Sequence, residues 1–171
     1  ARDGDFELLT LVLATLGDAI SAGQLTDKLA DWNSFARSLG QFHQRFDLFL
    51  TPTLAHPPVM HGSGDPPSGQ RAALGFLQRT GLLGVMARLR LLDRTTDQIA
   101  RDSLRYVPFT QLANLTGTPA MSVPLYWTPD GLPLGVQFIA PWGREDRLLQ
   151  LARQMEVTQP WFHRLPACAT A

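Results

Sequence analysis

The sequence is short of the residue types on which several function classes depend. Cysteine occurs once, at Cys168, which excludes an internal disulfide and any metal site built from several cysteines. A chain without disulfides is typical of a reducing compartment, so we expect a cytoplasmic protein. Lysine also occurs once, at Lys28, and the seven serines are scattered along the chain. The chain therefore offers few candidate catalytic residues.

An excess of charge of either sign is also absent. Fifteen basic and fifteen acidic side chains cancel, and no basic cluster is interleaved with aromatic residues. This balance gives no electrostatic reason to expect nucleic acid or an acidic lipid surface. The apolar run from Leu8 to Leu16 is too short to span a bilayer and is flanked by Glu7 and Asp18. We expect no nucleic-acid partner and no membrane partner.

The length of 171 residues is that of one domain, and we assign residues 1–171 to a single domain. The first residues, Ala1 to Asp5, have no initiator methionine and none of the organisation of a signal peptide. We therefore interpret this beginning as a position inside a longer chain.

Apolar periodicity and turn residues predict an α/β architecture. Helical spacing predicts helices over residues 6–20, 26–45, 71–92, 93–106 and 144–158. We expect Thr26 to cap the second helix and the third to be interrupted near Gly81 and Gly84. β-rich runs predict strands over 47–50, 120–125 and 134–140, and residues 51–70, rich in Pro, Gly, Ser and His, predict a long irregular loop. The fold class is a parallel or mixed sheet flanked by helices.

The same patterns predict which elements are covered. We expect helix 6–20 to be largely buried, and strands 120–125 and 134–140, which are nearly continuous in apolar residues, to be buried on both faces. Helix 26–45 carries a stripe typical of core packing, formed by Trp32, Phe35, Leu39, Phe42 and Phe46. Because three strands make a thin sheet, we expect it to be part of a larger sheet or to form a homo-oligomer through its exposed edges or apolar surface.

The most distinctive stretch runs from Phe109 to Pro141, FTQLANLTGTPAMSVPLYWTPDGLPLGVQFIAP. It predicts a helical turn closed by Gly117, a strand, a Gly/Pro turn and a second strand. Its sequence resembles the C-terminal part of the amidase signature family. Two further segments match that family in the same order: the strand Asp47 to Thr53, which ends in Thr-Pro-Thr, and the closing helix and tail from Asp146 to Pro166.

The resemblance implies a hydrolase that cleaves carboxamides through a serine acyl-enzyme, with a lysine and a second serine, held on a cis peptide, relaying protons. In the family these groups come from a lysine and a Gly/Ser-rich segment that precede the matched region. Lys28 lies on the outer side of a predicted helix, and Gly62-Ser63-Gly64 lacks the family's run of serines and glycines. We therefore assign no catalytic residue, no metal site and no cofactor, interpret the catalytic N-terminal half as missing, and expect the chain alone to be inactive.

The resemblance does imply substrate contacts, because the segments after Thr-Pro-Thr and around Asn-Leu-Thr-Gly help to wall the family's cleft. The positions carried over are Thr51, Pro52, Thr53, Phe109, Thr110 and Asn114. Thr53 and Asn114 can alternatively satisfy backbone groups of a turn and a helix end. The expected partner is a small-molecule amide, bound by the full-length enzyme.

Other hypotheses about function stay open at this point. An amidotransferase subunit would tend to carry an acidic residue where Val107 stands, whereas Gln111 and the pair Tyr126-Trp127 resemble the branch that contains 6-aminohexanoate cyclic-dimer hydrolase. A non-catalytic scaffold that dimerises through its sheet edges is a further alternative. A metal hydrolase would use His56, His61 and Asp65. We expect Ser122 to pack within its strand and Asp47 to cap or to pair locally beside Arg45.

Overall fold

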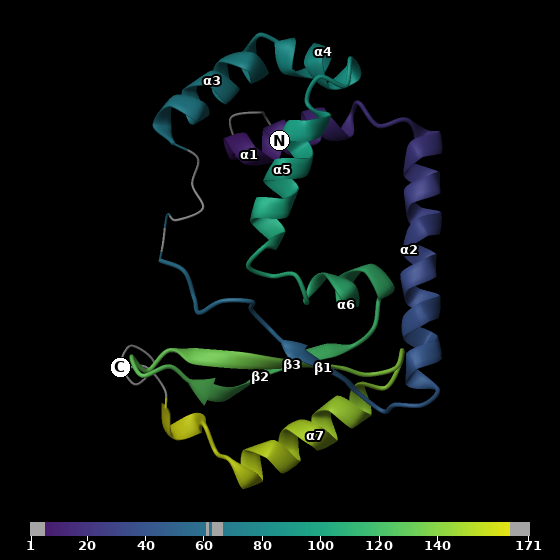
Figure 1. The fold of residues 1–171 in the computed structure, drawn as a ribbon, viewed down its shortest axis with the longest axis vertical. Coiled ribbons are helices and arrows are strands. Elements are labelled where there is room, and N and C mark those ends of the chain that lie inside the picture. Colours follow the sequence, from purple (N-terminus) through teal and green to yellow (C-terminus); the bar gives the residue numbers. More distant parts are fainter. Residues whose placement is uncertain (1–5, 61, 63–66, 165–171) are drawn as a thin grey trace. The chain divides into compact units, whose positions relative to one another are not determined.

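The computed structural model describes residues 6–60, 62 and 67–164, and the chain divides into two compact units. The helical unit comprises residues up to 29 together with 60–104, and the sheet unit comprises residues 30–59 together with those from 105 onward. Helix α2, Ala22–His43, runs from the first into the second (Figure 1). A single domain over residues 1–171 stays a prediction.

The helical unit is built from short helices with little apolar cover. Its elements are α1 (Leu8–Gly17), α3 (Ser68–Arg79), α4 (Leu82–Arg88) and α5 (Asp93–Leu104), with α1 packed on α3 and α4. The Thr15 hydroxyl donates to the Gln78 side chain at 3.0 Å across the α1–α3 contact. Val12 is the buried residue of α1, whereas Phe6, Leu9, Leu13 and Ile20 are about half exposed. The prediction that helix 6–20 is largely buried is therefore wrong. Apolar periodicity shows which side of a helix is apolar, but it does not show whether another element of the fold packs against that side.

Helix α2 begins at Ala22, four residues before the expected start. The Ser21 hydroxyl accepts the N–H of Gln24 at 3.2 Å, and the Gln24 side-chain oxygen accepts the N–H of Ser21 at 2.9 Å. This reciprocal pair is a capping box. Thr26 lies inside the helix, where its hydroxyl donates to the carbonyl of Ala22. Ser21 is thus the cap, and the assignment to Thr26 is wrong.

The third predicted helix is divided at Gly81, as expected, because this glycine has a left-handed backbone with φ of 71°. Gly84 causes no interruption and lies within α4. Helix α3 begins at Ser68, so the irregular segment after the first strand ends at Pro67 rather than at residue 70.

Helix α4 is followed by Arg90, a residue with a side chain in the left-handed backbone conformation, with φ of 57°. The N–H of Leu91 donates to the carbonyl of Met86 at 3.1 Å, and the N–H of Arg90 to that of Ala87 at 3.0 Å, which is the Schellman pattern. Glycine adopts this conformation without steric cost, so Arg90→Gly should stabilise the helical unit by up to about 1 kcal/mol. Hydrogen exchange of the α4 amides measures it. Arg88→Gly, in the last turn of the same helix, is the control and should destabilise; a loss of protection in Arg90→Gly as well would contradict the prediction.

The sheet unit contains three antiparallel strands in the order β1–β3–β2. They are β1 (Phe49–Pro52), β2 (Ala120–Trp127) and β3 (Pro133–Ile139). The α/β class, a sheet with flanking helices, is confirmed, and among the described strands every pairing is antiparallel. The register of β2 shifts between Pro124 and Tyr126, where proline can donate no backbone hydrogen bond.

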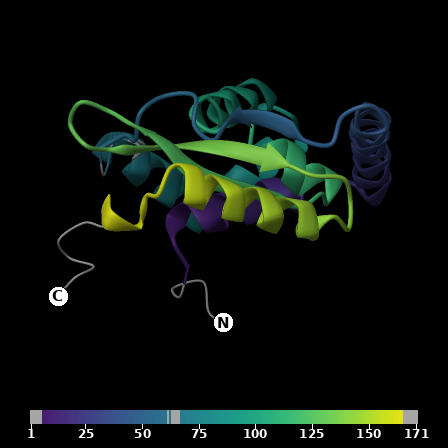
Figure 2. The ribbon, with the colours of Figure 1, turned by 90° about the horizontal axis from the view of Figure 1, so that it is seen from below.

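Helices lie on both sides of this sheet (Figures 1 and 2). Helix α7 (Glu145–Thr158) covers one face, where Val123, Phe138, Ala140 and Leu148 form a buried cluster. On the other face Ile139, fully buried, packs with Leu39 of α2 and Ala113 of α6 (Gln111–Thr116). Gly117, with φ of 67°, ends α6 as expected.

Strand β2 is only partly covered, so burial on both faces is wrong for this strand. Its residues Ala120, Ser122 and Tyr126 are exposed, whereas the C-terminal end of β3 is buried. The stripe on α2 is also covered only in part: Leu39 and Phe42 pack in the core, but Trp32 and Phe35 are 43% and 50% exposed.

None of the described helices is by itself both long and apolar enough to cross a bilayer; α1 and α2 meet that description only as a pair, which is sharply bent at the break between the two helices. The cytoplasmic location stays a prediction.

Candidate functional site

The two segments expected to wall a cleft meet on strand β3. Thr51 of β1 and Ser122 of β2 are both in register with Gln137, so these three residues form one row across the sheet. Two residues further along β3 from Gln137, Ile139 pairs with Phe49 and packs against α6. Because side chains two residues apart share a face, the row lies on the α6 side of the sheet and not on the α7 side.

Next to this row a pair of hydroxyl groups closes over Gly135. The N–H of Thr53 donates to the carbonyl of Gly135 at 3.0 Å, and the hydroxyl oxygens of Thr53 and Ser122 are 2.6 Å apart. A Cβ atom at position 135 would stand 2.4 Å from the Ser122 oxygen and 2.7 Å from the Thr53 oxygen. Any larger residue would have to displace the pair, which joins the turn after β1 to strand β2.

Gln137 connects the same strand to the turn before α6. Its side chain is 5% exposed, and its Nε2 donates to the carbonyl oxygen of Phe109 at 3.4 Å. Phe109 precedes Thr110, the N-cap residue of α6, whose hydroxyl donates to the carbonyl of Val107 at 3.2 Å. The amide of one β3 side chain therefore tethers the entry to α6.

Thr51 is 8% exposed, and among the described residues its hydroxyl oxygen has no hydrogen-bond partner. Burying a hydroxyl without a partner costs roughly 1–3 kcal/mol. It lies beside Gln137 in the register, on the same polar face of the sheet.

The expected substrate contacts divide into two groups. Thr51, Thr53 and Phe109 belong to the polar arrangement on β3, and Thr110 follows Phe109 directly. Pro52 is exposed and pairs with Val136, which places it on the α7 side of the sheet. Asn114 is exposed on α6. The structure thus brings four of the six positions to one region, and substrate contact stays a prediction for all of them.

Sequence reasoning missed three residues of this region: Ser122, Gly135 and Gln137. Ser122, expected to pack within its strand, is exposed and bonds to Thr53 instead. Two signals were present in the run Leu134 to Ile139, namely an isolated glycine and a single polar side chain within an apolar strand. An isolated glycine in a strand often marks the close approach of another group.

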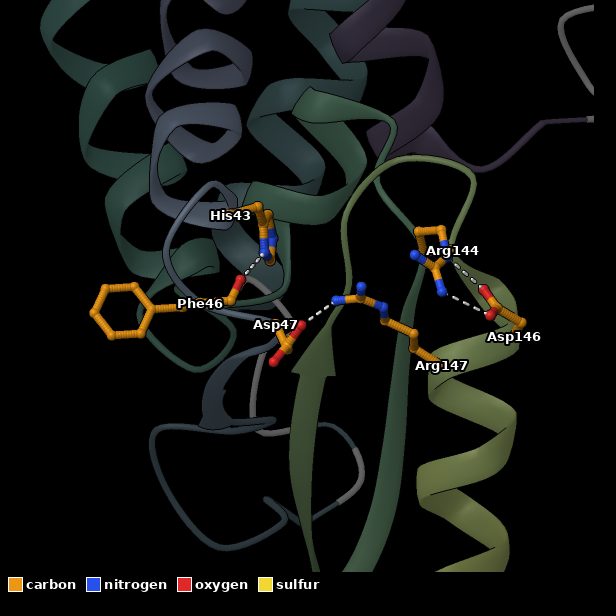
Figure 3. Close-up of polar contacts among 6 residues, drawn as sticks. All are labelled: His43, Phe46, Asp47, Arg144, Asp146 and Arg147. Carbon is orange, nitrogen blue, oxygen red and sulfur yellow. Dashed lines mark hydrogen bonds and ion pairs between the residues drawn. The ribbon is translucent and has the colours of Figure 1, made fainter.

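The start of α7 is fixed by ion pairs (Figure 3). Arg144 donates to both carboxylate oxygens of Asp146, at 2.8 and 2.9 Å. Arg147 pairs with Asp47, which precedes β1, so local pairing of Asp47 beside Arg45 is wrong. The His43 Nδ1 lies 3.1 Å from the carbonyl oxygen of Phe46. Because a carbonyl only accepts, that nitrogen must be the donor in this contact.

The Arg144–Asp146 pair predicts a pH effect. Hydrogen bonding by Arg144 lowers the pKa of Asp146 from its ordinary value of 3.8 to about 2. Because the folded-state pKa is the lower one, ionised Asp146 stabilises the fold above about pH 4, and this contribution disappears as the pH falls toward 2. A carboxyl NMR titration should find the depressed pKa, and Arg144→Gln should return it toward the ordinary value. An unchanged Asp146 pKa in Arg144→Gln would contradict the assignment.

The chemistry available around β3 is hydrogen bonding by hydroxyl and amide groups. Among the described residues the partner of the Ser122 hydroxyl is another hydroxyl and not a base, and a hydroxyl partner does not activate it as a nucleophile. Within the described ranges no group of three or more His, Cys, Asp or Glu side chains could hold a metal. Of the proposed metal ligands, His56 packs edge-on against Tyr106, and His61 and Asp65 lie outside the described residues.

A cavity of about 360 Å³ lies elsewhere in the sheet unit, between α2, the end of α6 and the segment after β3. It is lined by Ala36, Gly40, His43, Gln44, Thr116, Thr118, Pro141 and Trp142. It contains none of the positions expected to contact substrate.

Known proteins resemble the chain along nearly its whole length. Lipoamidase of Enterococcus faecalis is 34% identical over 152 residues, which cover 89% of this chain and 20% of that protein. The 6-aminohexanoate-cyclic-dimer hydrolase of Pseudomonas sp. (strain NK87) is 50% identical over 64 residues, covering 37% of this chain and 13% of the relative. A solved structure of 6-aminohexanoate cyclic dimer hydrolase superposes with a TM-score of 0.67 at 25% identity, over 98% of this chain and 31% of that one.

The chain thus spans about a fifth of lipoamidase and less than a third of the solved hydrolase. A family model described as Amidase matches residues 15–149, which include α2, all three strands and the polar arrangement on β3. The chain therefore belongs to the amidase family.

Proposed function

We propose that this chain is the C-terminal part of an amidase that hydrolyses carboxamide bonds through a serine acyl-enzyme. The observation that carries the proposal is the family match over residues 15–149, combined with the anchoring of both expected wall segments on β3. The chain's short share of its relatives supports the view that it is one segment of the active enzyme.

The role proposed for the chain is to supply sheet, packing helices and part of the cleft wall. Thr51, Thr53, Phe109 and Thr110 form the inner part of that wall. Asn114, exposed on α6, contributes to its margin, whereas Pro52, exposed between Thr51 and Thr53, would meet substrate only from the α7 side of the sheet. The substrate proposed is a small amide; a related hydrolase has been solved in complex with its substrate, and it matches this chain with a TM-score of 0.66.

The reacting serine and lysine are proposed to come from the part of the enzyme that precedes this segment. Among the described residues the hydrogen-bond partner of the Ser122 hydroxyl is Thr53 and not a base, and the sequence holds a single lysine, Lys28, on helix α2. Acyl transfer needs an activated hydroxyl, a base within hydrogen-bond reach and an oxyanion site. No cofactor enters this scheme.

Self-association also belongs to the proposal. Both outer strands, β1 and β2, have an unpaired edge among the described elements, and large apolar side chains of the sheet unit are exposed, including Leu50, Tyr126, Trp142 and Leu149. The rest of the enzyme or a second copy would cover them. Nothing in the described part of the chain favours a scaffold or an amidotransferase subunit.

The purified chain alone should show no turnover of small linear and cyclic amides above the buffer rate. The physical reason is that the described partner of the Ser122 hydroxyl is another hydroxyl and not a base. Product formation followed by mass spectrometry measures this, with Ser122→Ala as the control for Ser122 chemistry. Turnover that copurifies with the chain and is lost in Ser122→Ala would contradict the proposed inactivity.

A further inference from the structure

Strand β3 holds both proposed wall segments at alternate residues. Gly135 accepts the backbone N–H of Thr53, and Gln137 donates through its side chain to the carbonyl of Phe109. Residues two apart in a strand project to the same face about 6.5–7 Å apart. The distance between Gly135 and Gln137 on β3 therefore sets the distance between the two points at which the wall segments are bound to the sheet.

The contacts at Gly135 and Gln137 differ in whether they depend on a side chain of β3. At Gly135 the contact is made by the backbone and by a hydroxyl pair that comes from the turn after β1 and from β2. At Gln137 it depends on one side-chain N–H group, which is almost fully buried at 5% exposure. The backbone of Gln137 is held by its pairing with Thr51 and Ser122, so its side chain starts from a fixed position.

The Phe109 carbonyl lies one residue before the N-cap of α6, and α6 is a single short helix of six residues. Below it, Leu112 and Ala113 pack on the core around Ile139 and hold the helix to the sheet. The turn at Phe109 and Thr110 is half-buried, and a hydrogen bond from the Gln137 amide to the Phe109 carbonyl joins it to the sheet.

We propose that Gln137 is a positioning residue of the amidase, whose side-chain amide holds the Phe109–Thr110 turn at the height required for the substrate-facing wall. It acts through the turn and touches no reacting atom. This inference rests on the proposed function, but the tether itself can be tested without any amidase activity.

The first test uses NMR of the 171-residue chain and two variants. Gln137→Met keeps the length of the side chain and removes the donor. It should shift the amides of Thr110 to Ala113 and speed their hydrogen exchange, while the β1–β3 pairing stays. Gln150→Met is the matched control, since Gln150 is exposed on α7; it should leave all of these amides unchanged.

Gln137→Glu adds a reversible readout within one sample. Its ionised carboxylate cannot donate to the Phe109 carbonyl, whereas the protonated acid can. The amides of Thr110 to Ala113 should therefore return toward their wild-type shifts as the pH falls, and burial raises the pKa at which this occurs. Amide shifts independent of pH would overturn the inference.

The second test uses the whole enzyme that contains this chain. Gln137→Met should raise KM about five- to tenfold with little change in kcat, because a displaced wall weakens substrate binding in ground and transition states alike. A fall in kcat with KM unchanged would overturn the positioning role. If the whole enzyme shows no amide hydrolysis although the NMR shifts appear, the proposed function fails while the tether stands, so the two failures are distinguishable.

Discussion

Replacing Ile139 by alanine should destabilise the sheet unit by about 3–4 kcal/mol, within the range found for fully buried aliphatic residues. Ile139 is fully buried, and it lies at the end of the central strand with Phe49 and Ala120 as its cross-strand partners. Its side chain fills the space between Leu39 and Ala113. Truncation leaves a cavity that neither helix can close without leaving the sheet. This loss is a large fraction of the roughly 5–15 kcal/mol that stabilises a typical domain.

Urea unfolding followed by circular dichroism measures the Ile139→Ala effect. Leu50→Ala is the matched control, because Leu50 is an apolar residue on the edge strand β1 and is 61% exposed. It should change stability by less than about 0.5 kcal/mol. Equal losses in the two variants would mean that the described core is not the one that holds the sheet together.

Gly135→Ala should destabilise the same unit by about 1–3 kcal/mol, the range for overpacking. The added Cβ would meet the Ser122 and Thr53 hydroxyl oxygens at 2.4 and 2.7 Å, and the Cβ of Thr53 at 3.1 Å. The hydroxyl groups can rotate away, but only by giving up their mutual hydrogen bond. The Thr53 Cβ can yield only if the end of β1 moves, because the Thr53 N–H is bound to the Gly135 carbonyl.

The control for Gly135→Ala is Gly40→Ala on α2, where an added Cβ meets no atom within 4 Å. In a helix, alanine is favoured over glycine, so this variant should be neutral or slightly stabilising. The double variant Ser122→Ala, Gly135→Ala should recover part of the loss, since the nearest clash is removed. Wild-type stability of Gly135→Ala itself would show that the hydroxyl pair does not close over this position.

Much of the sheet unit could be predicted because its signals are local. The αL glycine at Gly117 ends α6, and the Gly/Pro turn separates two β-rich runs, so helix and strands follow within a few residues of one another. The boundaries were less accurate where a competing cap was overlooked. Ser21 and Gln24 form a capping box that could be read directly from their spacing.

The contacts that define the candidate site could not be predicted in the same way. Thr53 and Ser122 are 69 residues apart, and Asp47 and Arg147 are 100 apart, so neither pair has a local signal. Their proximity follows from the β1–β3–β2 order and its register. The prediction of burial was wrong for a related reason. The apolar face of α1 is evident from the sequence, but whether that face is covered depends on the positions of other elements, which the sequence pattern does not predict.

The central claim is that this segment shapes the cleft of an amidase whose reacting groups lie elsewhere in the enzyme. The most direct measurement compares amide hydrolysis by the purified 171-residue chain with hydrolysis by the complete protein encoded by the reading frame in which it lies. The account predicts no turnover by the chain, and turnover by the complete protein that is weakened through KM when Gln137 is replaced by Met. Turnover by the chain alone, or a complete protein that hydrolyses no amide, would contradict it.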